Sequence, residues 1–535
     1  MLTPKELEKK YFVHSEGKKY VCKLCYDNWE PNSELKVKTL SKGSGYSWVT
    51  QHLNLKHSGY DDEKVSEQSL LISHDAENTW SWIEWIVEEN RELNFCEKPR
   101  VLKYTRNNLK PISQKTLKSR MEKIVKIMEK DLEKLLPNKF AISIDGWSEH
   151  GVHYLAIFAV GPEVLNNGTV LLGFSPFDQE DDLSSEQHSI FISDTLRKYS
   201  RTSKDLTFIV GDNCSTNRKL ARDFLSIPLI GCNSHKLNLS VQRYLGTDKK
   251  DMITARKNCT PDQFHRRYLI QKLSILMTKL KTIKGRAKLK EYTDYVAIKP
   301  NETRWNGNLR MVQRYLQFEA DIRELLMSDD SNFSLEISNL MPTLHESIEI
   351  RNLEKALKKF HSVSLILQKK DGEINLHDVR CMFDQLISDF GEDFANYLNA
   401  NSNIVNNPEF EKSIVKYIEN PSSLNEDDIL ALKSLELENV EVLKTFIKED
   451  IDIEGIDYAS SALNNSKKRK IERKYVDFSK IPVTSNVVER FFSQVKLNLT
   501  SIRNSLLPST LEMIMFLKLN RNLMSKMVVH RAIHS

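Results

Sequence analysis

The segment that most constrains the fold is a short alternating run at residues 139–150, KFAISIDGWSEH. Phe140, Ile142 and Ile144 repeat at period two, and Asp145 falls on the opposite face. The pattern predicts a half-buried β-strand that carries a carboxylate at its exit, where the backbone is rigid. Because Asp-Gly is also ordinary turn chemistry, Asp145 taken alone has a simpler interpretation as a turn residue.

The length and composition indicate a globular protein of several domains. The 535 residues suffice for about three or four domains. No apolar run approaches the roughly 20 residues of a membrane span and the first ten residues are polar, so we expect neither a membrane anchor nor a signal peptide. Seven cysteines, an odd number with one close CxxC pair, favour metal binding and buried thiols in a reducing compartment over a disulfide framework.

The first 60 residues carry two pairs of zinc-ligand side chains. Cys22 and Cys25 form CKLC, and His52 and His57 form HLNLKH, with 26 residues between the pairs. Such pairs can close a tetrahedral zinc site, on which so small a segment would depend for folding. The alternative is a chance CxxC near two solvated histidines. A zinc finger rich in basic and aromatic residues suits a phosphate backbone as its partner.

The next segment, residues 61–137, is predicted to be helical. Trp80, Trp82 and Trp85 fit a short amphipathic helix as core residues. Between Lys98 and Lys130 there are eleven basic residues and only two acidic ones. A helix with this composition presents either a solvated basic face or a track for DNA, and the zinc finger upstream favours DNA.

A strand-rich segment follows at residues 138–246. After the strand with Asp145 we expect two more strands, a helix, a strand that ends at Asp212, a second helix and a strand that ends at Cys232. This order resembles an RNase H-like core, in which acids on the first and fourth strands meet at adjacent strand ends. Asp212 also has a simpler interpretation as the cap of the following helix.

A long helical region at residues 247–480 then interrupts this core, and its charges are segregated. The span 266–290 holds nine basic residues and no acids, which favours a DNA-binding surface. The span 425–457 carries eleven acids against three bases and should lie away from DNA. A basic cluster at residues 466–475 fits either a nuclear import signal or a solvated linker.

The last segment, residues 481–535, returns to the core. Phe491 and Phe492 belong to a helix whose more polar side carries Glu489. A second helix near residues 508–524 is apolar nearly all round, so it must be buried in a core or against a partner. From this we expect at least a dimer.

Three carboxylates brought to one site repel each other. Their convergence is best explained by bound divalent metal ions, which offset this repulsion. Hard oxygen ligands select Mg²⁺ or Mn²⁺, and a two-metal site suits attack at a DNA phosphodiester. In this interpretation Asp145 bridges both ions, Asp212 holds one and Glu489 completes the other. The alternative for Glu489 is an ordinary glutamate on a helix surface.

The order of motifs resembles that of the hAT superfamily of DNA transposases. The motifs are a BED-type finger, IDGW, GDNCSTN, GCNSHKLNL, ETRWNGNLR and the C-terminal SNVVERFFSQVKLNLTSIRNSLLP. The resemblance implies an α/β RNase H-like core with a mixed five-stranded sheet, split by a large all-α insertion. It also implies a small N-terminal zinc finger, a helical linker domain and a C-terminal dimerisation region.

The resemblance further implies that Cys232, His235, Arg304 and Trp305 contact DNA, with Trp305 stacking on an unpaired base. A buried thiol, a satisfied core histidine and a core tryptophan are the structural alternatives for Cys232, His235 and Trp305. The function expected is that of a nuclear cut-and-paste transposase that binds and cleaves double-stranded element ends. A domesticated, catalytically silent DNA-binding factor is the alternative.

Overall fold

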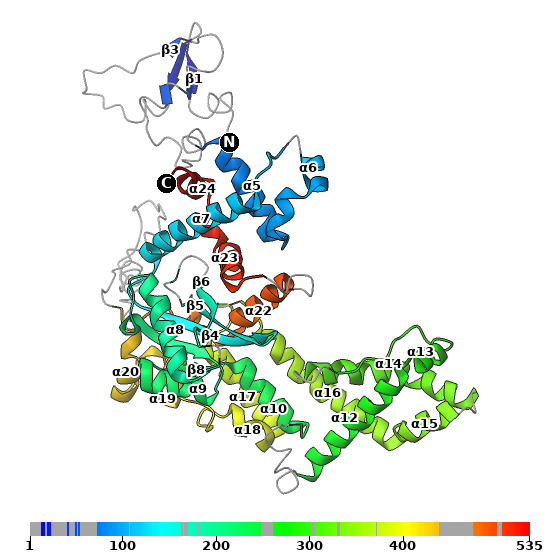
Figure 1. The fold of residues 1–535 in the computed structure, drawn as a ribbon. Helices are drawn as coiled ribbons and strands as arrows, with labels where there is room; N and C mark the ends of the chain where they lie inside the picture. Colours follow the sequence, from blue (N-terminus) through cyan, green and yellow to red (C-terminus); the bar gives the residue numbers. More distant parts are fainter. Residues whose placement is uncertain are drawn as a thin grey trace. The chain divides into compact units, whose positions relative to one another are not determined.

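The computed structural model in Figure 1 falls into two compact units, Met1–Ile127 with Met524–Ser535, and Met128–Leu523. The C-terminal helix therefore belongs to the N-terminal unit, which differs from the predicted grouping of residues 481–535. The structure describes residues 12–15, 19–22, 40–41, 49–50, 52–53, 72–105, 108–161, 164, 169–179, 181–247, 260–300, 305–328, 332–370, 372–437, 475–499 and 506–535.

The first unit combines a small antiparallel sheet with helices. The sheet consists of β1 (Phe12–Ser15), β2 (Lys19–Cys22) and β3 (Leu40–Ser41), in that order. The helices are α5 (His74–Glu88), the 3₁₀ turn η1 (Leu93–Glu97), α6 (Pro99–Thr105), the first part of α7 (Gln114–Leu135) and α24 (Lys526–His534). Trp82 of α5 is fully buried and stacks on Trp85, as its prediction as a core residue requires.

The second unit contains a mixed five-stranded sheet with the order β6-β5-β4-β7-β8. β4, β5 and β6 form the antiparallel meander, whereas β7 and β8 run parallel to β4. The order of elements predicted from the sequence is confirmed, and it is compatible with an RNase H-like core. The bounds are β4 (Phe140–Glu149), β5 (Val152–Val160), β6 (Thr169–Pro176), α8 (Ser185–Lys198), η2 (Ser203–Asp205), β7 (Leu206–Gly211), α9 (Ser215–Lys219), the π-helical turn η3 (Leu220–Leu225), β8 (Leu229–Gly231) and α10 (Asn233–Tyr244).

The helical insertion lies, in the sequence, between the last strand of this sheet and the last helices of the unit. Its helices are α12 (Pro261–Leu280), α13 (Ile283–Leu289), α14 (Asn306–Ser328), α15 (Asn332–Leu340), α16 (Leu344–Leu367), α17 (Leu376–Phe390), α18 (Glu392–Leu398), α19 (Pro408–Glu419) and α20 (Glu426–Ala431), with short turns η4 (Pro421–Ser423), η5 (Lys433–Leu435) and η6 (Phe478–Lys480). Figure 1 shows α12 to α16 as an arm that leads away from the sheet. A single cluster of buried apolar side chains joins the sheet to these helices.

The chain returns to the sheet through α22 (Asn486–Asn498) and α23 (Pro508–Leu519). Phe491 of α22 lies with its ring centroid 4.8 Å from that of Phe174 and 5.4 Å from that of Phe158. Phe492 stacks on Trp147 of β4 at 5.7 Å. These aromatic contacts cover the face of the sheet to which Asp145 also belongs, because alternate residues of a strand share a face.

The apolar helix α23 packs on β6 within the same chain, and its residues from Met513 to Leu517 are buried there. Just beyond its end, the Asn520 side chain exchanges two hydrogen bonds with the backbone of Leu171, at 2.9 and 3.1 Å. The reason for expecting at least a dimer was the need to cover this helix. That reason does not hold, because β6 of the same chain already covers the helix.

No helix among the described residues is long and apolar enough to cross a membrane.

The seating of α22 gives a stability prediction. We expect Phe491→Ala to destabilise the second unit by about 3 to 5 kcal/mol, because it empties a fully enclosed aromatic site. The matched control is Leu497→Ala on the same helix, whose side chain is 60% exposed and whose loss should change stability by less than about 0.5 kcal/mol. Urea unfolding followed by far-UV circular dichroism measures both, and equal shifts of the midpoint would contradict this seating.

Candidate active site at the carboxyl edge of the sheet

Asp145 lies within β4, and Asp212 directly follows β7, the strand that pairs with β4 in parallel. Ser143 of β4 pairs with Val210 of β7, and a Cβ placed on Gly211 would lie 3.2 Å from the Ile144 carbonyl oxygen. Extended by two residues past this last pair, and past the end of β7 at Gly211, the register would set residue 145 opposite residue 212. Adjacent strands lie about 4.8 Å apart, so the two carboxylates start from neighbouring backbone positions.

Asp145 lies inside a strand and not in a turn. β4 continues past it to Glu149, which pairs with Val152, and Asp145 itself pairs with Ala156. The simpler turn interpretation is therefore wrong. The Asp145 carboxylate accepts a hydrogen bond from the backbone N–H of Gly146 at 2.9 Å.

The glycine after Asp145 leaves room for a side chain on the opposite face of the sheet. A Cβ on Gly146 would lie 2.7 Å from Nε2 of His153, which sits diagonally across on β5. The His153 ring is fixed by a contact of 2.8 Å between its Nδ1 and the Ser148 hydroxyl. Burial, with a smaller contribution from His188, lowers the pKa of His153. The Asp-Gly pair thus marks close cross-strand packing.

Asp212 directly follows β7 and contacts a histidine from the next strand end. Its Oδ2 lies 3.3 Å from Nδ1 of His235, and each side chain is about one-third exposed. The side chain of Asn217 donates to the Asp212 backbone carbonyl at 3.0 Å. The N-cap of α9 is Cys214, whose Sγ accepts from the Asn217 N–H at 3.4 Å, so the helix-cap interpretation of Asp212 is wrong.

Cys232 directly follows β8 and holds the start of α22. The residue is fully buried, and its Sγ accepts a hydrogen bond from the backbone N–H of Ser485 at 3.4 Å. Beside it, the Asn233 side chain donates to the Val483 carbonyl at 2.8 Å. Burial, helped by the nearby Asp212, raises the pKa of the Cys232 thiol to about 12. The buried-thiol alternative describes Cys232 in this structure, which gives DNA no access to it.

Glu489 stands in the first turn of α22, at the same edge of the sheet. Asn486, one turn earlier, donates to the Ser234 hydroxyl at 3.1 Å and to the Leu367 carbonyl at 2.8 Å. These bonds tie the start of α22 to the residues that follow β8. Glu489 and His235 line the same open cleft of about 490 Å³, and His235 contacts Asp212.

Sequence reasoning missed most of the polar lining of this cleft. Asn238, Asn306 and Gln368 bring amide groups to it from α10, α14 and the end of α16. Within the described part of the chain, the Oδ1 atoms of Asn238 and Asn306 are buried without a hydrogen-bond partner. Single amides carry no spacing signal in a sequence, and only the fold of the insertion gathers them.

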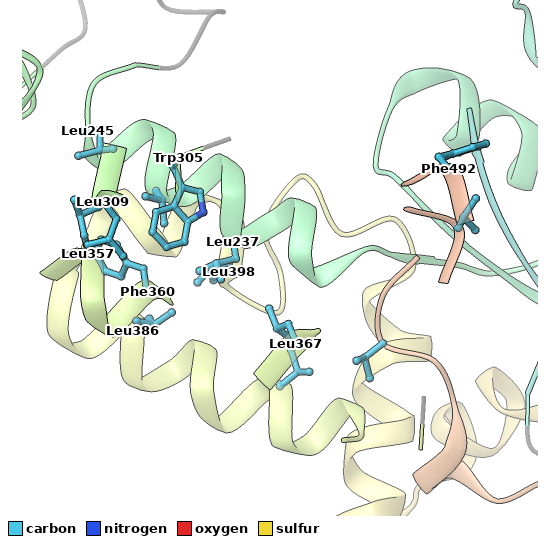
Figure 2. Close-up of a cluster of buried hydrophobic side chains, with 14 of the residues drawn as sticks. Leu237, Leu245, Trp305, Leu309, Leu357, Phe360, Leu367, Leu386, Leu398 and Phe492 are labelled. Atoms are coloured by element: carbon cyan, nitrogen blue, oxygen red, sulfur yellow. The ribbon is translucent and has the colours of Figure 1, made fainter. Parts of the chain in front are cut away.

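Trp305 lies mainly in the helical core. Its side chain is 5% exposed and its ring meets those of Phe360 and His361 edge-on, at 6.3 and 6.4 Å. Figure 2 shows it among Leu237, Leu309 and Phe360, and part of it lines the cleft. The core-tryptophan alternative describes this conformation. Its neighbour Arg304 lies outside the described residues.

The metal predictions remain untested. Across the described ranges, no group of three or more His, Cys, Asp or Glu side chains is arranged to hold a metal ion. Asp145, Asp212 and Glu489 thus share an edge without converging on one ion, although their oxygen donors are of the type that Mg²⁺ and Mn²⁺ prefer.

Only part of the proposed zinc site can be described. Cys22 is buried at the end of β2, and the His52 ring lies 5.6 Å from that of Phe12. Cys25 and His57 lie outside the described residues.

Comparisons with known proteins give only distant likenesses, all of them among solved structures. No protein-family model and no curated protein matches the sequence. Among solved structures, the chain is similar to the Drosophila P element transposase strand transfer complex, with 12% sequence identity and a TM-score of 0.33. The match covers 90% of this chain and 100% of that one. A TM-score this low supports no inference about the activity of the chain.

The burial of Cys232 predicts both its reactivity and a pH effect. We expect iodoacetamide at pH 8 to modify the exposed Cys381 but to leave Cys232 untouched until the protein unfolds. An unfolded thiol ionises near pH 9, whereas the folded one does so near pH 12. The stability that depends on this thiol is therefore complete below pH 9 and is lost as the pH rises from 9 to 12.

Peptide mass spectrometry after timed alkylation measures the reactivity, and urea titrations of wild type and Cys232→Ala at pH 8 and 10 measure the pH effect. Alkylation of Cys232 at the rate of Cys381 in the folded protein would refute its burial.

Proposed function

We propose that this protein is a DNA-cleaving and DNA-joining enzyme of the hAT transposase type. The observation that carries the proposal is that His235, which contacts Asp212, lines one polar cleft with Glu489, while Asp145 lies on β4, the strand paired with β7. Glu489 reaches that cleft 277 residues after Asp212, across the whole helical insertion. A fold that sets Glu489 in a polar cleft together with His235, which contacts Asp212, suits chemistry on a phosphodiester.

In the proposed site, Asp145 would bridge two Mg²⁺ or Mn²⁺ ions, Asp212 would hold one and Glu489 the other. Such ions, when bound, supply activation of a water or a 3′-hydroxyl and stabilise the departing oxygen. His235 holds one oxygen of Asp212 and so sets the direction of that carboxylate. Arg490 lines the cleft beside Glu489 and brings a guanidinium suited to a phosphate.

We further propose that the chain binds double-stranded DNA through residues 1–130, acts in the nucleus and assembles with further copies of itself. A zinc ion bound by Cys22, Cys25, His52 and His57 would stabilise the finger. On the second unit, the polar lining of the cleft supports a nucleic-acid partner.

A second candidate function is that of a catalytically silent DNA-binding factor with the same fold. The observation that favours it is the lack of convergence of the three carboxylates among the described residues, together with the burial of Cys232 and Trp305. The two candidates share DNA binding and differ in metal binding and cleavage.

The enzyme candidate predicts nicking that depends on all three acids. With Mg²⁺ or Mn²⁺ and a supercoiled plasmid that carries the cognate terminal repeats, wild type should produce nicked circles. Asp145→Ala, Asp212→Ala and Glu489→Ala should each lower the rate by at least about a hundredfold, because each removes a metal ligand. The control Asp223→Asn changes an exposed carboxylate of η3, which pairs with Arg222, and should retain the wild-type rate.

Agarose gels score the nicks, and titration calorimetry scores Mg²⁺ or Mn²⁺ binding by wild type and by Asp145→Ala. Tight DNA binding without nicking, together with equal heats of metal binding for wild type and Asp145→Ala, would contradict the enzyme candidate. That result would favour the catalytically silent DNA-binding factor.

The finger predicts about one zinc ion per chain. Purified full-length protein should release one equivalent of zinc on denaturation, and Cys22→Ser should release almost none and bind DNA more weakly. Cys381→Ser, which changes an exposed thiol of the other unit, is the matched control. A wild-type protein that contains no zinc after purification in zinc-supplemented medium would exclude the finger.

A further inference from the structure

The basic run at residues 266–290 divides into two halves with different roles. In the first half, Arg266 pairs with Asp393 at 2.9 Å, and Lys272 pairs with Glu346 at 2.8 Å. Lys279 pairs with a third carboxylate, that of Glu336. These three cations of α12 form ion pairs with acids on α15, α16 and α18. Their charge is therefore neutralised by carboxylates of the same chain.

The second half turns its cations to the solvent at the corner between α12 and α13. Lys281, Lys284, Arg286 and Lys290 are all exposed. The backbone is closely packed at this corner, because a Cβ on Gly285 would lie only 2.5 Å from the Lys279 carbonyl oxygen. With Gly285 and Leu289 buried on its inner face, α13 presents its basic residues outward.

The neighbouring helix α14 adds two arginines to the same region. The Arg314 guanidinium lies 5.0 Å from the centroid of the Tyr295 ring and donates to the Val296 carbonyl at 2.9 Å. Arg310 is exposed one turn earlier. Tyr295 is 47% exposed and lines a hollow of about 80 Å³ together with Arg286 and Lys290. An exposed aromatic ring therefore lies among three cations.

Basic residues outnumber acids in the two segments that form this region, although Glu336 of α15 lies close enough for Lys279 and, more weakly, Lys284 to lower the pKa of its carboxyl. Residues 281–300 and 305–314 contain eight Lys and Arg side chains, against only Glu291 and Asp294 as acids. We call the α13 surface the set Lys281, Lys284, Arg286, Lys290, Tyr295, Arg310 and Arg314. It lies on the helical arm in Figure 1, away from the five-stranded sheet.

We propose that the α13 surface binds the phosphate backbone of duplex DNA, as a contact separate from the acids at the edge of the sheet. Arginine forks match phosphate oxygens, and the Tyr295 ring offers a face for sugar or base. Arg310 and Arg314 follow Trp305, which lines the cleft, at intervals of about one helical turn. DNA that leaves the cleft along α14 therefore meets successive cations.

This inference rests on the proposed function for its choice of partner, and the experiment separates the two. Full-length protein is titrated into a fluorescent 30-base-pair duplex, and anisotropy gives Kd between 50 and 200 mM KCl. The test variant is Lys284→Glu/Arg286→Glu/Lys290→Glu. Its control, Lys204→Glu/Lys355→Glu/Lys433→Glu, makes the same change in net charge at exposed lysines elsewhere in the second unit.

The test variant should weaken binding at least tenfold at 100 mM KCl. Its plot of log K against log[KCl] should also be shallower, by about 0.9 for each phosphate that the protein no longer neutralises. The control should change Kd by less than about threefold. A neutral variant, Lys284→Gln/Lys290→Gln, should show an intermediate weakening with unchanged circular dichroism, which separates weaker phosphate binding from misfolding.

Equal affinities for the test and control variants would overturn the inference, as would a wild type that binds polyglutamate but not DNA, which would assign the surface to an acidic protein. DNA binding that depends on these residues without any nicking would support the inference and contradict the proposed enzyme.

Discussion

The packing of α22 against the sheet is the interaction on which the candidate site depends. Phe491 and Phe492 seal one face of β4, β5 and β6, and the turn before them is hydrogen-bonded to the residues after β8. Burial of the two aromatic rings stabilises the contact between α22 and the sheet. The hydrogen bonds fix the position of α22 along the sheet. Because Glu489 stands in the first turn of α22, this packing sets its position at the carboxyl edge.

Because of the insertion, this packing joins segments that are far apart in the sequence. Ser485 bonds to Cys232 across 253 residues of sequence. The insertion must therefore fold so that its two ends meet, and the buried contact between Lys236 and Glu411 helps to join the first helix after β8 to α19. A continuous apolar cluster joins the sheet to the insertion, so the two parts share one hydrophobic core.

The sequence predicted the features that local pattern determines. The period of two through Phe140, Ile142 and Ile144 identified β4, and the order of strands and helices identified the sheet. It could not decide features that depend on distant neighbours. The sequence of the apolar helix α23 is the same whether its own chain or a partner covers it. The burial of Cys232 depends on α22, and that of Trp305 depends on α16. The run at residues 266–290 looked uniform, because the acids that neutralise its first half lie on α15, α16 and α18.

The two edges of the sheet differ in the polarity of the side chains that surround them. At the amino ends of β4 and β7 there is a hollow of about 210 Å³ with a largely apolar lining that includes Phe140, Val160 and Phe208. At the other edge, Asp212 follows the buried strand β7 and contacts His235, and the cleft that His235 lines is also lined by amides, hydroxyls and the charged side chains of α22. Gathering three carboxylates for stability alone would be unfavourable, since like charges at one edge repel each other. The metal ions of the proposed function would relieve this repulsion, so the stability of this edge would then depend on the presence of a divalent cation.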